Sequence, residues 1–354
     1  MNPDWRAFLE ARGAQIDPER GALFGGAVDS PEPGCTLVDL SELGLIAIAG
    51  PDAMDFLQGQ VSNDLRELSD THSQLSSHCS AKGRMLANFR ALRIEDSLFL
   101  VLPRSQVPAL LKRLRMFTLR AKVQVDDASD ALVCAGIIGD CGDATLAAVF
   151  GGLPDDDNGL ARYQQTTLIR VAGPTRRWLL IGPAGQVEPI WASAAATAAE
   201  ADPDLWALHD IRAGIPVIRP ETSDAFVPQM TNMQLIDGVS FHKGCYTGQE
   251  VVARMQYLGK LKRRMYRAEV ETDATPKAGD ALFVPGSRSE QASDRIVDAR
   301  AVGPGRWELL VVVEIAAAEG AEVRLSEDGP VLTLTPPPYG FSVQSSPEAA
   351  GTST

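Results

Sequence analysis

The first candidate for chemistry in this chain is a thiol in the octapeptide KGCYTGQE, residues 243–250. Thr247 and Glu250 have the spacing of a capping box, which predicts a helix that begins at Thr247. The unpaired amide groups of a helix N-terminus, together with Lys243, stabilise a thiolate at Cys245, and the thiolate is the nucleophilic form of cysteine. A cysteine can equally be a small buried apolar residue. The Gly, Lys, Tyr and Gln residues around Cys245 favour a functional thiol whose pKa Lys243 lowers.

Basic side chains form two clusters in an otherwise acidic chain, whose formal net charge of −13 argues against general nucleic-acid binding. No acidic residue lies between Ser97 and Val125, and a second cluster follows Cys245. The clusters are either solvated surfaces, as most charge runs are, or they attract an anionic ligand. Their members are Arg104, Lys112, Arg113, Arg115, Arg120 and Lys122 in the first cluster, and Arg254, Lys260, Lys262, Arg263, Arg264 and Arg267 in the second.

Length and composition indicate a cytoplasmic protein of two or three domains. The 354 residues exceed the usual size of one domain, and no apolar run approaches the length of a membrane span. The N-terminus lacks the apolar core of a signal peptide. The five cysteines are scattered and, with only four histidines, form no ligand pattern. We therefore expect neither a disulfide framework nor a metal site.

Hydrophobic patterning predicts alternating strands and helices up to about residue 255, and short strands alone after residue 260. Strands are expected at 44–49, 74–80, 85–94, 98–102, 131–138, 166–171 and 178–181, and helices at 52–60, 105–119, 191–201 and 204–213. The later strands are expected at 264–270, 281–284, 296–301, 308–315 and 321–325. Helices packed on sheets followed by a small all-β unit indicate the α+β class.

Several motifs in a consistent order carry a family resemblance. The octapeptide, followed by Arg254 and by YLGK at 257–260, resembles the signature of the YgfZ family of folate-binding proteins, which are related to the aminomethyltransferase (T-protein) of the glycine cleavage system. The resemblance extends from about residue 35 to residue 335. Its other motifs are LQGQVSND at 57–64, CSAKGR at 79–84, RAGIP at 212–216 and FVPQMTN at 226–232.

The resemblance implies an aminomethyltransferase-like α+β fold, with three domains in a cloverleaf around a central cavity. The expected first domain is discontinuous, with residues 1–50 and 128–249, and the second spans 51–127. A small C-terminal β-barrel is expected at 250–335, and the Pro-rich and then polar residues 336–354 are expected to be a poorly ordered tail.

The same resemblance implies tetrahydrofolate, or a one-carbon derivative of it, as the cofactor. The edge of a reduced pterin needs paired donors and acceptors, its ring needs apolar walls, and the glutamate tail of a folate is anionic. Each candidate residue has an ordinary alternative, such as a turn at Asn63-Asp64 or a hairpin loop at residues 82–84. The candidates are Asn63, Asp64 and Gln249 for the edge, Met85, Tyr246 and Met255 for the walls, Arg254, Lys260 or the region 104–122 for the tail, and Lys82 and Arg212 in the adjoining motifs.

Two departures from the T-protein pattern argue against a classical aminomethyltransferase. Those enzymes carry an aspartate shortly after the lysine–glycine pair, whereas residues 84–88 here read RMLAN and contain no carboxylate. Arg212 stands where T-protein relatives have a glutamate that holds the pterin, and an arginine cannot accept the pterin's N–H groups. Cys245 is an addition relative to those enzymes.

The resemblance therefore implies a folate-binding protein that helps to maintain iron–sulfur enzymes and thereby supports tRNA modification, specifically methylthiolation. The expected partners are folate and iron–sulfur enzymes such as tRNA methylthiotransferases, with no membrane. One alternative is a folate-dependent one-carbon transferase that uses Cys245. A second alternative, motivated by the basic clusters, is a module that binds tRNA directly.

Overall fold

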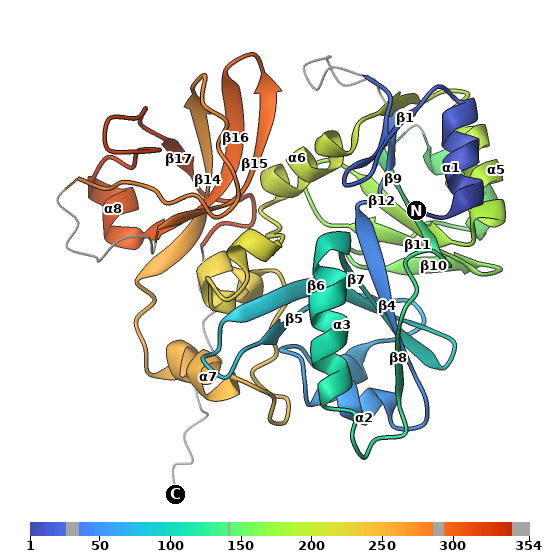
Figure 1. Cartoon of the computed structure of the whole chain (residues 1–354), viewed down its shortest axis with the longest axis horizontal. Helices are drawn as coiled ribbons and strands as arrows, with labels where there is room; N and C mark the ends of the chain where they lie inside the picture. Colours follow the sequence, from blue (N-terminus) through green and yellow to red (C-terminus); the bar gives the residue numbers. More distant parts are fainter. Residues whose placement is uncertain (26–34, 141, 286–293, 342–354) are drawn as a thin grey trace, which may run out of the picture.

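The computed structural model describes residues 1–25, 35–140, 142–285 and 294–341. Within them, strands form four sheets, and helices cover two of these sheets (Figure 1). The smallest sheet is the hairpin of β1 (Gln15–Asp17) and β2 (Gly21–Leu23). The mixture of antiparallel sheets and helices agrees with the predicted α+β class.

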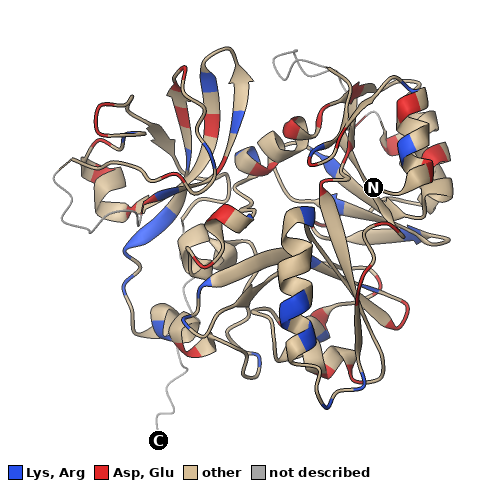
Figure 2. Cartoon of the chain, in the orientation of Figure 1, with Lys and Arg blue, Asp and Glu red and all other residues tan. Residues whose placement is uncertain are grey.

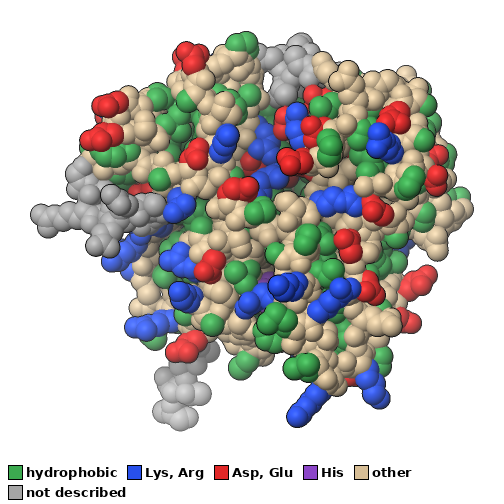
Figure 3. All heavy atoms as spheres, in the orientation of Figure 1, with side chains coloured by type: hydrophobic (Ala, Val, Ile, Leu, Met, Phe, Trp, Pro, Cys, Tyr) green, Lys and Arg blue, Asp and Glu red, His purple; other side chains and the backbone are tan. Residues whose placement is uncertain are grey.

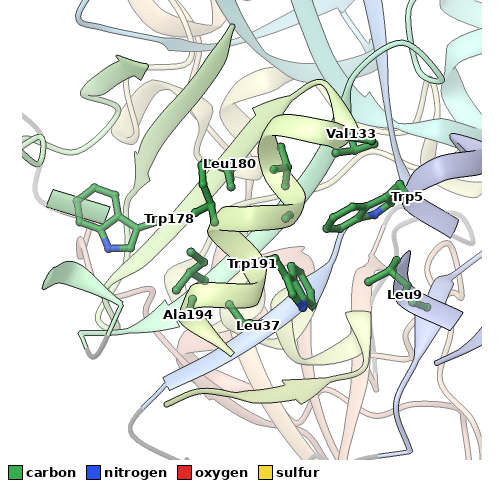
Figure 4. Packing of buried hydrophobic residues seen from close by; sticks show 14 of the residues in the cluster. Trp5, Leu9, Leu37, Val133, Trp178, Leu180, Trp191 and Ala194 are labelled. Carbon is green, nitrogen blue, oxygen red and sulfur yellow. The ribbon is translucent and has the colours of Figure 1, made fainter. Parts of the chain in front are cut away.

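A six-stranded sheet, with strand order β10-β11-β12-β9-β3-β13, forms the body that contains the N-terminus. Helices α1 (Pro3–Ala11), α4 (Asp143–Phe150) and α5 (Ala184–Ala194) supply apolar side chains to a cluster that includes Trp5, Trp178 and Trp191 (Figure 4). Trp206 of α6 (Pro203–Ala213) belongs to a second apolar cluster. The strands are β3 (Cys35–Asp39), β9 (Val133–Gly139), β10 (Leu160–Tyr163), β11 (Thr166–Val171), β12 (Arg177–Gly182) and β13 (Ala199–Ala201).

Two predictions about this body are wrong. The helix expected at 191–201 begins earlier, at Ala184, and ends at Ala194, while Ala199–Ala201 forms strand β13 parallel to β3. An alanine-rich run favours a helix locally, but the open edge of β3 offers backbone hydrogen bonds instead. Cys35 is disulfide-bonded, although the scattered cysteines indicated no disulfide.

A five-stranded antiparallel sheet, with order β5-β6-β7-β4-β8, forms the second body. Helices α2 (Ala53–Gln58) and α3 (Val107–Met116) bury apolar residues against it. Because β4 pairs with both β7 and β8, the domain boundary expected at residue 50 cuts through this sheet, and β4 belongs with residues 51–127. The strands are β4 (Leu43–Ala49), β5 (Gln74–Cys79), β6 (Met85–Ile94), β7 (Ser97–Pro103) and β8 (Gln124–Asp127).

The C-terminal region follows α7 (Gln249–Tyr257) and contains the four-stranded sheet β15-β16-β14-β17 and helix α8 (Ile315–Gly320). Its strands are β14 (Arg263–Glu271), β15 (Arg295–Gly303), β16 (Arg306–Glu314) and β17 (Thr333–Thr335). Over the described residues this sheet does not close, so the expected β-barrel is not confirmed.

The expected tail at 336–354 needs a correction in its first part. Tyr339 donates a hydrogen bond to Gly214 O (2.9 Å), and the Phe341 ring packs edge-on against Tyr266. Residues 336–341 are therefore anchored to the rest of the molecule, and the remainder of the expected tail lies outside the described residues.

A central apolar cluster joins these bodies. It contains Met85 of β6, Phe226, Met233, Val252 of α7 and Met265 of β14. Two segments that resemble family motifs contribute to this cluster, through Cys79 and Phe226, where the second sheet, α7 and the C-terminal sheet come together.

Candidate functional site

Lys243 ties the thiol motif to the first motif. Its side chain is almost fully buried, and Nζ donates hydrogen bonds to Gln58 O (2.7 Å), Val61 O (2.6 Å) and Asn63 O (2.8 Å). Nζ also lies 5.2 Å from the centre of the Tyr246 ring. An ammonium group has three N–H donors, so the three carbonyl oxygens use all of them. Lys243 therefore holds the loop of residues 58–63 in place.

Burial lowers the pKa of Lys243 to about 8, while the charge of Asp64 acts in the opposite direction. At neutral pH the amine is therefore mostly protonated, which is the form with three donors. We predicted that Lys243 lowers the pKa of Cys245. The three hydrogen bonds that the Lys243 ammonium makes with described residues all go to carbonyl oxygens of the first motif, and Cys245 is exposed. The effect of Lys243 on the thiol therefore stays a prediction.

The helix after the thiol does not begin as predicted. Helix α7 starts at Gln249, its N-cap is Gly248 in a left-handed conformation (φ 84°), and no side chain caps it. The prediction of a capping box from Thr247 to Glu250 is therefore wrong. Gly248 can take this conformation without strain because it lacks a Cβ. Cys245 lies on the exposed loop that precedes the helix.

Two glycines explain why the backbone turns in this way. A Cβ on Gly248 would lie 2.4 Å from Ser80 O, and a Cβ on Gly83 (φ 69°) would lie 2.7 Å from Cβ of Val251. The hairpin at residues 80–84 thus packs directly against the start of α7. Glycine at both positions permits this contact between the second motif and the thiol motif.

The free cysteines of the described residues differ sharply in their surroundings. Burial raises the pKa of Cys79 to about 12, and it raises the pKa of Cys134 to about 12 as well. Both thiols therefore stay protonated at neutral pH, and protonated thiols are poor nucleophiles. Cys245, by contrast, is exposed to solvent.

We expect iodoacetamide to modify Cys245 in the native protein at least tenfold faster than Cys79 or Cys134, because only exposed thiols meet the reagent. Mass spectrometry of the three cysteine-containing peptides at successive times measures the rates. The same reaction in urea should modify all three residues. Comparable native rates for Cys79 and Cys245 would contradict the burial described here.

The polar residues expected at a pterin edge have partners within the protein. Asn63 Nδ2 donates to Leu75 O (2.9 Å) and Asp237 O (2.6 Å). The Asp64 carboxylate accepts from Gln58 Nε2 (2.8 Å) and from the Arg66 amide (3.1 Å). Gln249 is half-buried, with Nε2 3.5 Å from Lys243 O. Asn63 and Asp64 thus support the loop, while Gln249 is the least constrained of the three.

Arg212 is paired with a carboxylate of the C-terminal sheet. Its Nη2 lies 2.8 Å from Glu308 Oε1, its Nε contacts both oxygens of that carboxylate, and Arg267 approaches the same group at 3.7 Å. This pair joins α6 to β16. Lys82, Arg254 and Lys260, the other expected cationic ligands, are exposed.

Two buried amides in the FVPQMTN segment were not singled out from the sequence. Gln229 Nε2 donates to Val252 O (2.7 Å), which links Gln229 to α7, and Asn232 Nδ2 donates to Met265 O (2.9 Å), which links Asn232 to β14. Gln229 Oε1 and Asn232 Oδ1 are buried and accept no hydrogen bond from the described residues. Buried acceptors without donors are uncommon, so a bound group or a water molecule is expected there. The sequence signal that could have identified these residues is the presence of two amide side chains in a mostly apolar segment.

Among the expected apolar walls, Met85 and Tyr246 are buried and Met255 is half-buried. The described residues contain no group of three or more His, Cys, Asp or Glu side chains placed to hold a metal ion. None of the helices described has the length and apolar character required to cross a membrane.

Comparison with known proteins relates both the sequence and the fold to characterised families. Residues 31–182 match the family model of the GCVT N-terminal domain. The chain is 32% identical over 308 residues to the tRNA-modifying protein YgfZ of Serratia proteamaculans, covering 87% of this chain and 93% of the relative. It is 33% identical over 311 residues to the protein of the same name from Edwardsiella ictaluri, covering 87% and 94%.

The fold also resembles that of the glycine cleavage system aminomethyltransferase T from Bartonella henselae. The TM-score is 0.71 and the two chains are covered to 96% and 98%, with 17% sequence identity. At that identity the likeness establishes the fold alone, whereas the sequence relatives match nearly end to end. The chain belongs to the YgfZ family of tRNA-modifying proteins.

Proposed function

We propose that this protein binds a reduced folate at the junction of the second sheet, α7 and the C-terminal sheet, and that it supports tRNA modification in the cytoplasm by helping to maintain iron–sulfur enzymes such as tRNA methylthiotransferases. The observation that carries the folate part is the pair of buried acceptors, Gln229 Oε1 and Asn232 Oδ1, which accept no hydrogen bond from the described residues. The amide and amino groups of a pterin are donors of the kind that these oxygens lack.

The residues around this junction fit such a ligand in other respects. Met85, Tyr246 and Met255 supply apolar or aromatic surface. Arg254 and Lys260 are exposed cations that suit an anionic glutamate tail. In this proposal Arg212 acts indirectly, because its guanidinium holds Glu308 and thereby joins α6 to the C-terminal sheet. The domains arranged around the ligand would form the cloverleaf that the resemblance implied.

A one-carbon transferase remains the alternative proposal, but the contacts favour it less. In the stretch where the T-protein pattern has its aspartate, the Asn88 side chain donates to Pro216 O (2.7 Å) and accepts from the Ile218 amide (2.8 Å). Asn88 therefore has a structural role and cannot act as an acid or base. In this alternative, Cys245 would be the reactive group.

We expect the intact protein to bind tetrahydrofolate saturably in anaerobic calorimetry. The Cys245→Ala variant should bind equally well, because this exposed thiol is not needed to hold the ligand. Gln229→Met keeps the side-chain volume but removes one acceptor, so the dissociation constant should rise about tenfold.

Absence of binding in both the wild type and Cys245→Ala would refute the folate site. If Gln229→Met binds tetrahydrofolate with unchanged affinity, Gln229 is not part of the folate site. Thermal unfolding of each variant is the control for general damage, since Gln229 also donates a hydrogen bond to α7.

A further inference from the structure

Exposed hydrophobic side chains are concentrated in two short segments of this protein. Six of the eight large hydrophobic residues exposed in the described part of the chain lie at the end of α3 or on and just after α7. Leu119 is 92% exposed and Leu258 is 85% exposed. Such a concentration indicates an interaction surface rather than chance exposure. The six residues are Met116, Phe117, Leu119, Val251, Tyr257 and Leu258.

The same two segments carry cations that have no acidic partner. Most arginines elsewhere are paired, as Arg93 is with Asp70 and Arg177 is with Asp210. Around the exposed hydrophobic residues, Arg115 is paired with Asp126, but six other cationic side chains are exposed and form no ion pair with another described residue. They are Lys112, Arg120 and Lys122 near α3, and Arg254, Lys260 and Lys262 near α7.

Contacts through β5 connect α3 to α7. Arg113 Nε of α3 donates to His78 Nε2 of β5 (2.8 Å), and the hairpin that follows β5 packs on the start of α7 through Gly83 and Gly248. Figure 2 shows basic residues on both helices, and Figure 3 shows basic and hydrophobic side chains together across the lower half of this view. We call this surface, formed by residues 112–122 and 251–262, the basic–apolar face.

The composition of this face distinguishes between two kinds of anionic partner, an acidic protein and a nucleic acid. Protein interfaces are depleted in lysine, whereas lysine is a common ligand of phosphate groups. Four of the six unpaired cations are Lys112, Lys122, Lys260 and Lys262. Phe117 and Tyr257 are exposed aromatic rings, on which unpaired bases can stack. Because the whole chain carries a net charge of −13, RNA would be repelled from much of the remaining surface.

We propose that the basic–apolar face binds RNA directly, with lysine and arginine side chains on the phosphates and with Phe117 and Tyr257 against unpaired bases. The choice of tRNA as the RNA rests on the proposed function, whereas the class of ligand rests on the face itself. Cys245, on the exposed loop before α7, would lie beside the bound RNA.

The test is fluorescence anisotropy with a labelled, unmodified tRNA transcript and the full chain at a series of KCl concentrations. We expect saturable binding. The logarithm of the association constant should fall linearly with the logarithm of the salt concentration. The triple variant Lys112→Gln, Arg120→Gln, Lys122→Gln should bind about tenfold or more weakly at about 0.1 M salt, and its salt slope should be smaller by about 2–3. These side chains are exposed, so the variant should keep its fold.

Lys277→Gln is the matched control, because Lys277 is also exposed and has no ion pair with a described residue, but lies outside the face. It should bind tRNA as the wild type does. Equal affinity of the triple variant and the wild type would overturn the proposal. So would displacement of tRNA by a polyglutamate peptide of equal charge, which would indicate an acidic protein as the partner.

Tetrahydrofolate titration of the triple variant separates this inference from the proposed function. We expect its folate affinity to be unchanged, because the variant retains Arg254 and Lys260, the cations assigned to the glutamate tail in the proposed site. Loss of tRNA binding with folate binding intact supports the face as a distinct site. If the wild-type protein binds folate but not tRNA, the proposal of an RNA-binding face is wrong and the proposed folate site is unaffected. If it binds tRNA but not folate, only the proposed folate site is wrong.

Discussion

Replacing Lys243 with methionine is expected to lower the free energy of unfolding by about 3 kcal/mol or more. Methionine fills most of the space of the lysine stem but donates no hydrogen bond. The carbonyl oxygens of Gln58, Val61 and Asn63 would lose a donor in a buried site, and each buried group left unsatisfied costs about 1–3 kcal/mol. Urea denaturation followed by circular dichroism measures the change.

Lys82→Met is the matched control for this experiment, since Lys82 lies on the neighbouring hairpin but is exposed. Its free energy of unfolding should stay within about 0.5 kcal/mol of the wild type. If the two variants are equally stable, Lys243 does not hold the first motif in place. Folate affinity should also fall in Lys243→Met, because the loop at 58–63 adjoins the proposed site; Lys82→Met is the control for stability only.

Gly248→Ala is expected to destabilise the protein by about 3 kcal/mol or more, because two costs combine at one position. The added Cβ would lie 2.4 Å from Ser80 O, which is a backbone atom that cannot swing away. The φ angle of 84° is also unfavourable for alanine. The hairpin at 80–84 and the start of α7 would have to separate. Thermal and urea unfolding measure the loss.

Gly244→Ala provides the comparison within the same loop. A Cβ on Gly244 would have no atom of the described structure within 4 Å, so this substitution should change stability by less than about 1 kcal/mol. Similar losses in both variants would mean that the loop tolerates no side chain anywhere. A stable Gly248→Ala would contradict the close packing of the two motifs.

Local patterning predicted many of the longer elements of the first two bodies, but it missed α1, β3, β8, α4 and β10. The strand expected at 85–94 is β6 (Met85–Ile94), and the helix expected at 204–213 is α6 (Pro203–Ala213). Both are recognisable because neighbouring side chains along the chain decide which face is buried. The pattern failed at residues 199–201, where pairing with β3 overrides the helical preference of alanine.

The thiol motif shows the same limit at the level of single residues. Thr247 and Glu250 satisfy the spacing of a capping box, yet the helix begins after Gly248. The reason lies in the hairpin at 80–84, whose backbone leaves room only for a glycine at this point. A capping rule considers four consecutive residues and cannot include a contact from a distant segment.

By itself, the sequence determined the family, the α+β class, many of the longer strands and helices of the first two bodies, and the presence of a thiol among basic residues. These features follow from residue types and short-range spacing. Only the tertiary structure decided what the polar groups bind. Lys243 reaches the loop at 58–63, Arg212 reaches Glu308, and Gln229 keeps a buried acceptor without a donor. Each outcome depends on which distant backbone or side-chain atoms meet in the folded molecule, and the same residue types would serve equally well as ligands or as internal supports.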